Sequence, residues 1–428
     1  MKILHTSDWH IGRSLYGRKR YEEFLRFFDW LIDCIEAEGI EALLVAGDIF
    51  DNGTPSNLAQ ELYYRFLGRV AGTGCRHVVV TAGNHDSPSL LNAPREILRL
   101  LNVHVVGCLT EVVAEELVLL RDIDNKPQLI VCAVPYLRDR DIRRAEAGET
   151  FEDKGRKLVL GIHDHYHLVA EAAEALSATL GGGVPIVAMG HLFASGGKTV
   201  DGDGVRELYV GSLGQVRADA FPACFAYLAL GHLHVAQRVR AFVQSSSDGD
   251  SVQSPLGGGS ELCRYSGAPL AMSFGEAGQT KVVLVVSVAG GGVTVEERAV
   301  PCFQRLATVR GDWNQISSRV AALREEGCSV WLEVLYQGDE LVAALQERVR
   351  ELTDGTQLEV LRTKDLRLAA RTLNGQTMAE TLDDLKVDEV FERCLLAQQV
   401  PPEQHDELFT LFRETVLALH DADPRGGG

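Results

Sequence analysis

Five short apolar segments of this sequence each end in a group of aspartate, asparagine or histidine residues, most of them through a glycine. These groups are Asp8-Trp9-His10, Gly47-Asp48, Gly83-Asn84-His85-Asp86, Gly190-His191 and Gly231-His232-Leu233-His234. Short apolar segments are typical of buried strands, and in open α/β sheets ligands bind at the carboxyl ends of the strands. The pattern therefore predicts a sheet that gathers metal-binding side chains at one end.

The first 110 residues alternate between strand-like and helix-like patterns. Between the first two strands lies a helix pattern, from Tyr21 to Ile35, whose apolar residues are spaced three and four apart. Strands that alternate with helices favour parallel pairing in an α/β sheet. The predicted strands are 2–6, 42–46, 77–81, 103–106, 129–134, 186–189, 207–210, 227–230 and 262–265, followed by a hairpin over 281–288 and 293–297.

The pattern changes near residue 301, where a small α+β unit begins and is followed by two amphipathic helix candidates, 381–398 and 404–420. The stretch 244–260 is rich in Ser, Gly and Asp and is typical of a flexible loop without a core of its own. The resulting divisions are a sheet-bearing unit over 1–275, a hairpin connection over 276–300, the α+β unit over 301–372 and a helical segment over 379–422.

Composition places the chain among globular proteins. Its 428 residues are 46% hydrophobic and 24% charged, which suits two or three domains with real cores. The net charge of −18 argues against passive wrapping of nucleic acid, but it leaves room for a local metal-lined site that faces phosphates.

The nine cysteines include no C-x-x-C and fit reduced thiols. No apolar run reaches the roughly 18 residues of a membrane helix, and Asp8 comes too early for a signal peptide, so we expect a soluble, cytoplasmic protein without membrane contact.

The residue types in the five groups indicate a site for divalent metal ions. Carboxylate and amide oxygens mixed with imidazoles suit Mn(II), Fe(II) or Zn(II) and do not suit calcium. The D-x-H and H-x-H spacings predict two ligands from one strand end, because alternate residues of an extended segment point to the same side. Two neighbouring ions suit phosphoryl chemistry, in which they activate a water molecule and neutralise charge on the phosphate oxygens.

In this order, the five groups resemble the signature of the calcineurin-like metallophosphoesterases, which is D-x-H, G-D, G-N-H-[DE], G-H and G-H-x-H. The resemblance covers residues 1–275 and implies a four-layered α/β/β/α sandwich that hydrolyses phosphoesters. It implies one metal ion held by Asp8, His10, Asp48 and His234, and a second held by Asp48, Asn84, His191 and His232, with Asp48 bridging. It also implies that His85 protonates the leaving group or steadies the transition-state phosphate, and that Asp86 orients His85.

A closer resemblance is to the SbcD family, the nuclease subunits of bacterial SbcCD complexes. It is carried by the opening Met-Lys-Ile-Leu-His-Thr-Ser-Asp-Trp-His-Ile-Gly-Arg and by Ala-Gly-Asp-Ile-Phe-Asp, Ala-Gly-Asn-His-Asp-Ser-Pro, Ala-Leu-Gly-His-Leu-His and Tyr-Ser-Gly-Ala-Pro-Leu. This resemblance implies a DNA nuclease with two divalent ions, Mn(II) being the favoured metal. It implies exonuclease activity on double strands, endonuclease activity on single strands and hairpins, and a role in DNA replication, recombination and repair.

The same resemblance implies partners for the chain. The 301–372 unit would be a capping domain, and the 379–422 segment would bind an SbcC-type ABC ATPase, in a heterotetramer that contains a homodimer of this chain. The chain has no G-x-x-x-x-G-K-[ST] loop, so any ATP dependence has to come from that partner.

Several residues near the motifs keep more than one interpretation. Asp51 stands where the archaeal and eukaryotic branch of the family has a second catalytic histidine, so we place it in the layer behind the metal ligands, with its role open. Arg13, Arg18, Lys19 and Arg20 could contact a DNA backbone or could belong to a solvated loop.

Three alternate histidines, His163, His165 and His167, look like a metal cluster. They continue into a helix pattern, on which residues two apart point in different directions, so a structural role is favoured.

Two rival functions remain. One is a phosphoesterase for proteins or small phosphate esters, against which the 301–428 extension argues. The other is a structural adaptor that anchors the ATPase and whose nuclease site is secondary.

Overall fold

The structure of the chain is a computed structural model that describes residues 1–143, 149–194, 216–217, 221–239, 262–289, 292–338, 345–366, 391–392, 395–396, 400–401 and 404–421. The predicted strand 207–210, the predicted loop 244–260 and most of the predicted helix 381–398 lie outside these residues. Within them, no helix combines the length and the apolar character needed to cross a membrane.

The first sheet contains the four strands predicted in the first 110 residues. β1 (Lys2–Thr6), β4 (Ala42–Ala46), β5 (His77–Thr81) and β6 (Val103–Val106) pair in parallel with the predicted bounds. Short runs of β-branched and other apolar residues favour such buried strands. The predicted hairpin forms β13 (Val282–Ala289) and β14 (Gly292–Ala299), and β13 pairs antiparallel with β1, so the order is β14-β13-β1-β4-β5-β6.

The second sheet has the order β11-β12-β10-β9-β8-β7. Its strands are β7 (Leu117–Arg121), β8 (Pro127–Ala133), β9 (Ile186–His191), β10 (Phe225–Gly231), β11 (Gln237–Arg238) and β12 (Cys263–Tyr265). The strands β8, β9, β10 and β12 are parallel, whereas β7 is antiparallel to β8. The edge strands β7 and β11 were not predicted, and β11, with two residues, is too short to carry a periodicity.

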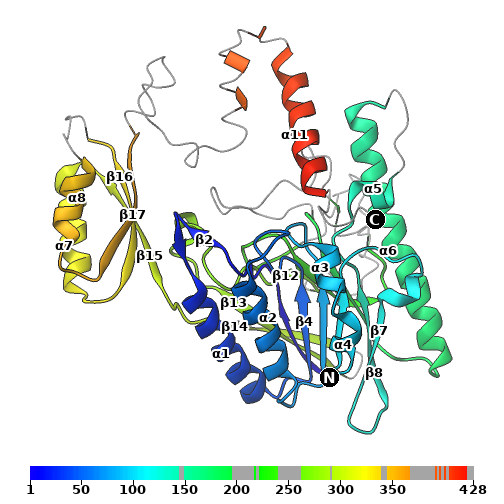
Figure 1. Ribbon diagram of the computed structural model, residues 1–428. Coiled ribbons are helices and arrows are strands. Elements are labelled where there is room, and N and C mark those ends of the chain that lie inside the picture. Colours follow the sequence, from blue (N-terminus) through cyan, green and yellow to red (C-terminus); the bar gives the residue numbers. More distant parts are fainter. Residues whose placement is uncertain are drawn as a thin grey trace, which may run out of the picture.

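The two sheets pack face to face and helices cover their outer faces (Figure 1). The inner core includes Leu44 and Val79 from the first sheet and Val187, Met189 and Ala229 from the second, all fully buried. α1 (Tyr21–Glu38) and α2 (Asn57–Val70) cover the first sheet, and α6 (Phe151–Thr179) covers the second. The predicted four-layered α/β/β/α sandwich is therefore confirmed.

Short helical turns complete the sandwich. They are α3 (Pro88–Asn92), α4 (Arg95–Arg99), α5 (Asp139–Ile142) and the 3-10 turns η1 (Val113–Glu116) and η5 (Phe274–Glu276). A small hairpin of β2 (Ser14–Leu15) and β3 (Arg18–Lys19) follows the first polar group of the sequence.

A separate three-stranded parallel sheet lies beside the sandwich (Figure 1). It alternates with two helices in the order β15 (Arg305–Gly311), α7 (Trp313–Glu325), β16 (Val330–Tyr336), α8 (Leu345–Thr353) and β17 (Leu358–Asp365). It has a core of its own, which includes Val309, Ile316, Leu332 and Val349. Asp312 and Gln315 form a capping box that starts α7, because each side chain bonds the backbone amide of the other.

The last described element is α11 (His405–Asp421), close to the predicted helix 404–420. Phe391, from the segment before it, stacks on Phe412 with ring centroids 4.0 Å apart and an angle of 2° between the rings. The two parts of the C-terminal segment therefore contact each other through aromatic side chains.

Candidate metal centre

Four of the predicted ligands lie just beyond the strand ends, on strained backbone. Asp8, His10, Asp48 and His232 have φ angles of 53°, 48°, 50° and 102°, values that residues other than glycine rarely adopt. Backbone hydrogen bonds hold the first turn: the Asp8 and His10 amides donate to the carbonyls of Gly47 and Asp48, each at 3.0 Å. The explanation offered for the D-x-H spacing is therefore wrong, because Asp8 and His10 converge through a left-handed turn and not along an extended strand.

Two glycines allow the loops of the site to approach one another. A Cβ atom at Gly83 would collide with the carboxylate of Asp48, and a Cβ atom at Gly231 would collide with the carbonyl oxygen of Ala46. Glycine at these two positions therefore brings the strand ends of both sheets close enough to share one site.

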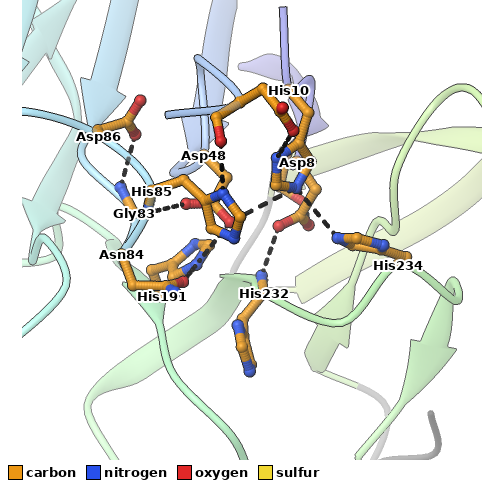
Figure 2. Close-up of polar contacts among 12 residues, drawn as sticks. Asp8, His10, Asp48, Gly83, Asn84, His85, Asp86, His191, His232 and His234 are labelled. Carbon is orange, nitrogen blue, oxygen red and sulfur yellow. Dashed lines mark hydrogen bonds and ion pairs between the residues drawn. The ribbon is translucent and has the colours of Figure 1, made fainter. Parts of the chain in front are cut away.

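One compact group of donors consists of Asp8, His10 and His234, whose ligand atoms all lie within 4.8 Å of one another (Figure 2). The Nε2 atoms of His10 and His234 are 3.0 Å apart. All three residues are buried. These are three of the four residues that the resemblance assigns to the first ion.

A second compact group consists of Asp8, Asp48 and His191. Asn84 joins it, since its Oδ1 atom lies 3.0 Å from His191 Nε2. The Oδ2 atom of Asp48 lies 3.5 Å from His10 Nε2 and 3.4 Å from His191 Nε2. Asp48 thus stands between the two groups, where a bridging ligand has to stand.

The backbone of His232 reaches the site, but its ring does not join either compact group. The His232 amide donates to Asp8 Oδ1 at 2.8 Å, whereas the ring points away from the carboxylates (Figure 2). Its centroid lies 5.4 Å from that of His191. The ring therefore has to turn before it can bind an ion together with His191.

Charge is balanced within the buried group. Burial by itself would raise the pKa of Asp48, but the imidazoles of His191, His85 and His10 outweigh it and hold this pKa well below its usual range. Burial would lower the pKa of His191, but the Asp48 carboxylate outweighs it and raises the pKa to about 9. Burial lowers the pKa of His10 despite Asp51 and Asp48. A cation therefore has to compete with a proton at His191 and meets a neutral ligand at His10.

The donor set fits divalent metal ions. Its members are buried, and they mix carboxylate, amide and imidazole atoms. The residues that would hold the ions are those of the two compact groups together with Asn84.

His85 lies beside these two groups and is a member of neither. Its backbone amide donates to Asp48 Oδ1 at 2.9 Å, and its Nδ1 atom lies 2.8 Å from the carbonyl oxygen of Asp51. A carbonyl oxygen only accepts, so Nδ1 carries a proton and donates. His10, Asp51 and His85 also form a third group with ligand-type atoms within 4.8 Å, which makes a metal-ligand role for His85 testable.

The described hydrogen bonds of the Asp86 carboxylate run to the backbone, so its role in orienting His85 stays a prediction. The Asp86 carboxylate accepts hydrogen bonds from the backbone amides of Ile49, Phe50 and Gly83, at 3.1, 2.9 and 2.8 Å. It therefore joins the loop that carries Asp48 to the loop that carries His85, while the carbonyl of Asp51 orients the His85 ring. Burial and the neighbouring Asp48 charge raise the pKa of Asp86 to about 7, against the three amides.

The comparisons with known proteins agree along the whole chain. The family described as calcineurin-like phosphoesterase matches residues 1–235, and the family described as Type 5 capsule protein repressor C-terminal domain matches residues 302–399. The SbcD subunit of nuclease SbcCD from Escherichia coli (strain K12) is 35% identical over 422 residues, which cover 98% of this chain and 98% of that protein. The chain belongs to the SbcD family of calcineurin-like phosphoesterases. It is a phosphodiester hydrolase whose site binds divalent metal ions.

Other relatives in the SbcD family match a shorter part of the chain. The SbcD protein of Rhodobacter capsulatus is 37% identical over 297 residues, and that of Bacillus subtilis is 33% identical over 293 residues. Each match covers 68% of this chain and 67% of the relative. A solved dimetal phosphatase from Danio rerio covers 70% of this chain and 96% of its own, with 11% identity and a TM-score of 0.37, a likeness too weak to support an argument.

The four basic residues that follow the first SbcD motif differ in environment. Arg20 is only 2% exposed, pairs with Glu23 and donates to the carbonyl of Ala271 at 2.7 Å. It is therefore a structural residue, and the prediction that it contacts DNA is not supported. Arg13 lies 3.3 Å from Asp51 Oδ1. Arg18 and Lys19 are exposed, and Arg18 lies 3.1 Å from Glu359.

The alternate histidines 163, 165 and 167 lie on α6, as the structural interpretation predicts. The Nε2 atom of His165 is buried against Glu116 at 2.8 Å. His163 and His167, one helical turn apart, stack with ring centroids 4.0 Å apart. The three side chains therefore do not converge on one point.

Sequence reasoning missed residues that support the ligands from behind. The hydroxyl of Ser7 bonds the carboxylate of Asp8 and lies 2.8 Å from the hydroxyl of Ser266. Ser266 stands in the Tyr-Ser-Gly-Ala-Pro segment that carries the SbcD resemblance, and that was the only signal for it. Glu276, next to His234, had no signal, since it is a single acid 42 residues away in sequence.

Proposed function

We propose that this chain is the DNA nuclease subunit of an SbcC-type ATPase complex, with Mn(II) as its metal. It would act as an exonuclease on double strands and as an endonuclease on single strands and hairpins, in DNA replication, recombination and repair. The observation that carries the proposal is the convergence of Asp8, His10, Asp48, His191 and His234 from separate strand ends in one buried group. The end-to-end similarity to a relative named as a nuclease subunit supports DNA as substrate.

We propose that Asp8, His10, Asp48 and His234 hold one ion and that Asp48, Asn84, His191 and, after a ring rotation, His232 hold the other. When bound, the two ions supply an activated water molecule and neutralise charge on the phosphate. The residues of the chain hold the metal ligands in place. Asp48 stays in place between the groups because its Oδ1 atom accepts the His85 amide.

The proton for the departing sugar oxygen comes from His85 in this proposal. His85 Nδ1 donates its proton to the Asp51 carbonyl oxygen, 2.8 Å away, so Nε2 is the nitrogen that can give a proton to the leaving group. Asp51 therefore contributes through its backbone to His85 and through its side chain, 3.6 Å from His10 Nδ1, to a predicted ligand. Asp86 joins the loops that carry these residues.

We propose that each part of the chain has its own function. Residues 1–275 and the hairpin connection 276–300 form the nuclease, residues 301–372 form the capping domain, and residues 379–422 bind the ATPase. Arg13, Arg18 and Lys19 are proposed to contact the DNA backbone, with Arg13 nearest to the metal site through Asp51. Two copies of the chain would pair within a heterotetramer, and the protein would work in the cytoplasm on nucleoid DNA.

One assay tests this function. The purified chain with Mn(II) is offered linear duplex DNA and, in parallel, a generic phosphodiester, each with and without the ATPase subunit and ATP; EDTA is the control. DNA cleavage that changes with the partner and ATP supports the proposal. Hydrolysis of the small ester alone, unaffected by the partner, would leave the family assignment in place and remove the nuclease function.

A further inference from the structure

Glu276 is a buried acid that the proposed mechanism does not use. It lies in η5, has no exposed surface, and its Oε2 atom pairs with the ammonium group of Lys281. Its Oε1 atom is buried and has no hydrogen-bond partner among the described residues. Burying a carboxylate is costly unless both of its oxygens have partners, so this arrangement needs a reason.

The unpartnered oxygen faces a predicted metal ligand. Glu276 Oε1 lies 3.8 Å from Nδ1 of His234, and the opposite ring nitrogen, Nε2, lies 3.0 Å from His10 Nε2 inside the metal group. The distance of 3.8 Å exceeds a hydrogen bond, but a small rotation of either side chain closes it. Glu276 therefore stands behind the His234 ring, on the side away from the metal group.

Lys281 fixes the carboxylate in this position. Its ammonium group bonds Glu276 and also donates to the carbonyl oxygen of His234 and to Gln279 Oε1, each at 3.2 Å. One lysine thus ties the acid to the backbone of the very histidine that the acid faces. An ion pair that served only the stability of η5 would not need the second carboxylate oxygen to point at His234.

We propose that Glu276 is a positioning residue for His234. As an acceptor on Nδ1, it keeps the proton on that nitrogen, so that Nε2 presents its lone pair to the metal ion. This inference rests on the proposed function, in which His234 is a metal ligand. It concerns metal affinity, because the wrong tautomer of His234 places a proton where the ion has to bind.

Amide substitution tests the tautomer directly. In Glu276→Gln, Lys281 still needs an acceptor and takes the amide oxygen, so the amide NH2 faces His234 Nδ1 as a donor and favours the wrong tautomer. We expect the Kd for one of the two Mn(II) ions to rise by about 10- to 100-fold. The full-length chain is titrated with Mn(II) alone, and free Mn(II) is followed by electron paramagnetic resonance.

A second substitution separates positioning from stability. In the double variant Glu276→Gln/Lys281→Met the amide can turn and offer its oxygen to Nδ1, so we expect most of the lost affinity to return. Glu276→Leu/Lys281→Met has no acceptor and should stay about 10- to 100-fold weaker. Both double variants replace the two charged residues of the pair, so neither leaves an unpaired buried charge. They can therefore be compared with each other even if Glu276→Gln alone does not fold.

Glu116→Gln is the matched control, since Glu116 is also fully buried and its Oε2 atom bonds a histidine, His165, that lies outside the metal group. It should leave both Kd values within about twofold of the parent. Unchanged Mn(II) affinity in Glu276→Gln, or equal affinity in the two double variants, would overturn the positioning role. A parent chain that binds no Mn(II) would instead overturn the metal site of the proposed function, and the inference with it.

Discussion

Asp8, His10 and Asp48 each combine a left-handed backbone with nearly complete burial. Each such conformation costs about 1–3 kcal/mol and persists only where the surrounding fold determines it. Here the surroundings are the paired loops after β1 and β4, joined by backbone hydrogen bonds and by the Asp86 carboxylate. The fold thus holds the ligand backbone in place before any ion binds.

His85→Gln tests the proton donor at the residue scale. We expect cleavage to fall by about 10²- to 10⁴-fold, because the amide cannot transfer a proton. We expect the number of Mn(II) ions bound to stay at two, because the two compact donor groups of the proposed ion sites do not include His85. Cleavage is measured on duplex DNA and metal content by equilibrium dialysis. Loss of an ion would show instead that His85 is a ligand, through the group that it forms with His10 and Asp51.

His5 makes the stability of the fold depend on pH. Burial lowers the pKa of His5 to about 3, against a backbone carbonyl that raises it, and its Nδ1 atom lies 2.9 Å from the Tyr227 hydroxyl. The unfolded chain binds this proton near pH 6.5 and the folded chain near pH 3, so stability is present above pH 6.5 and is lost as the pH falls toward 3. From pH 7 to pH 5 the loss should be on the order of 2 kcal/mol.

The measurement is urea unfolding in EDTA at pH 7 and pH 5. His5→Gln cannot titrate, so its free energy of unfolding should fall by about 2 kcal/mol less than that of the parent over this interval. Tyr227→Phe keeps the imidazole and should keep the pH dependence of the parent. Parallel behaviour of the parent and His5→Gln would refute the assignment.

Among the elements, the β2–β3 hairpin connects the metal centre to the small parallel sheet. Leu15 packs with Phe274, Leu306 and Trp331. Tyr16, at the tip of the hairpin, accepts a hydrogen bond from Arg362 of β17 at 2.6 Å, and the Arg362 guanidinium lies 4.8 Å from its ring centroid. The small sheet therefore holds a hairpin that begins four residues after His10.

Arg362→Gln should loosen that hairpin. It removes the bond to Tyr16 and the ion pair with Glu333, contacts worth about 1.5–3 kcal/mol where a charge is involved. Amide hydrogen exchange over residues 12–19 should therefore speed up by about tenfold or more. Arg305→Gln removes a surface pair with Glu326 and should leave exchange in the hairpin unchanged. Unchanged exchange in Arg362→Gln would show that the hairpin is held without the small sheet.

At the scale of the whole molecule, the described residues of the C-terminal segment belong to none of the hydrophobic core clusters. None of the five core clusters of the described residues includes a residue beyond Leu361. Within the described part of this segment, Phe391 instead packs on Phe409 and Phe412 of α11. The exposed fractions of Leu396 and Leu411 are 62% and 52%, which suits a helical segment that contacts another protein.

Truncation after residue 378 should therefore leave a folded hydrolase that no longer binds the ATPase. We expect the melting temperature of the truncated chain to stay within a few degrees of the parent, because the core clusters remain. Co-purification with the ATPase subunit should be lost. Normal co-purification would contradict the docking role. Loss of function in cells on truncation, with function kept in His85→Gln, would favour the adaptor over the nuclease.

The sequence by itself determined the strands β1, β4, β5 and β6 and the set of predicted ligands. Both signals are local: β1, β4, β5 and β6 are short apolar runs, and Asp8, His10 and Asp48 follow directly in the chain. The order of the groups also sufficed to recognise the family, because each group has its own motif.

Only the tertiary structure decided what each side chain does. Asp86 bonds three backbone amides, Arg20 is buried, and the His232 ring points away from the carboxylates. Glu276 reaches His234 across 42 residues of sequence. These facts follow from left-handed turns and from contacts between distant segments. Such contacts arise when two sheets pack together, and residue type and spacing along the chain carry no record of them.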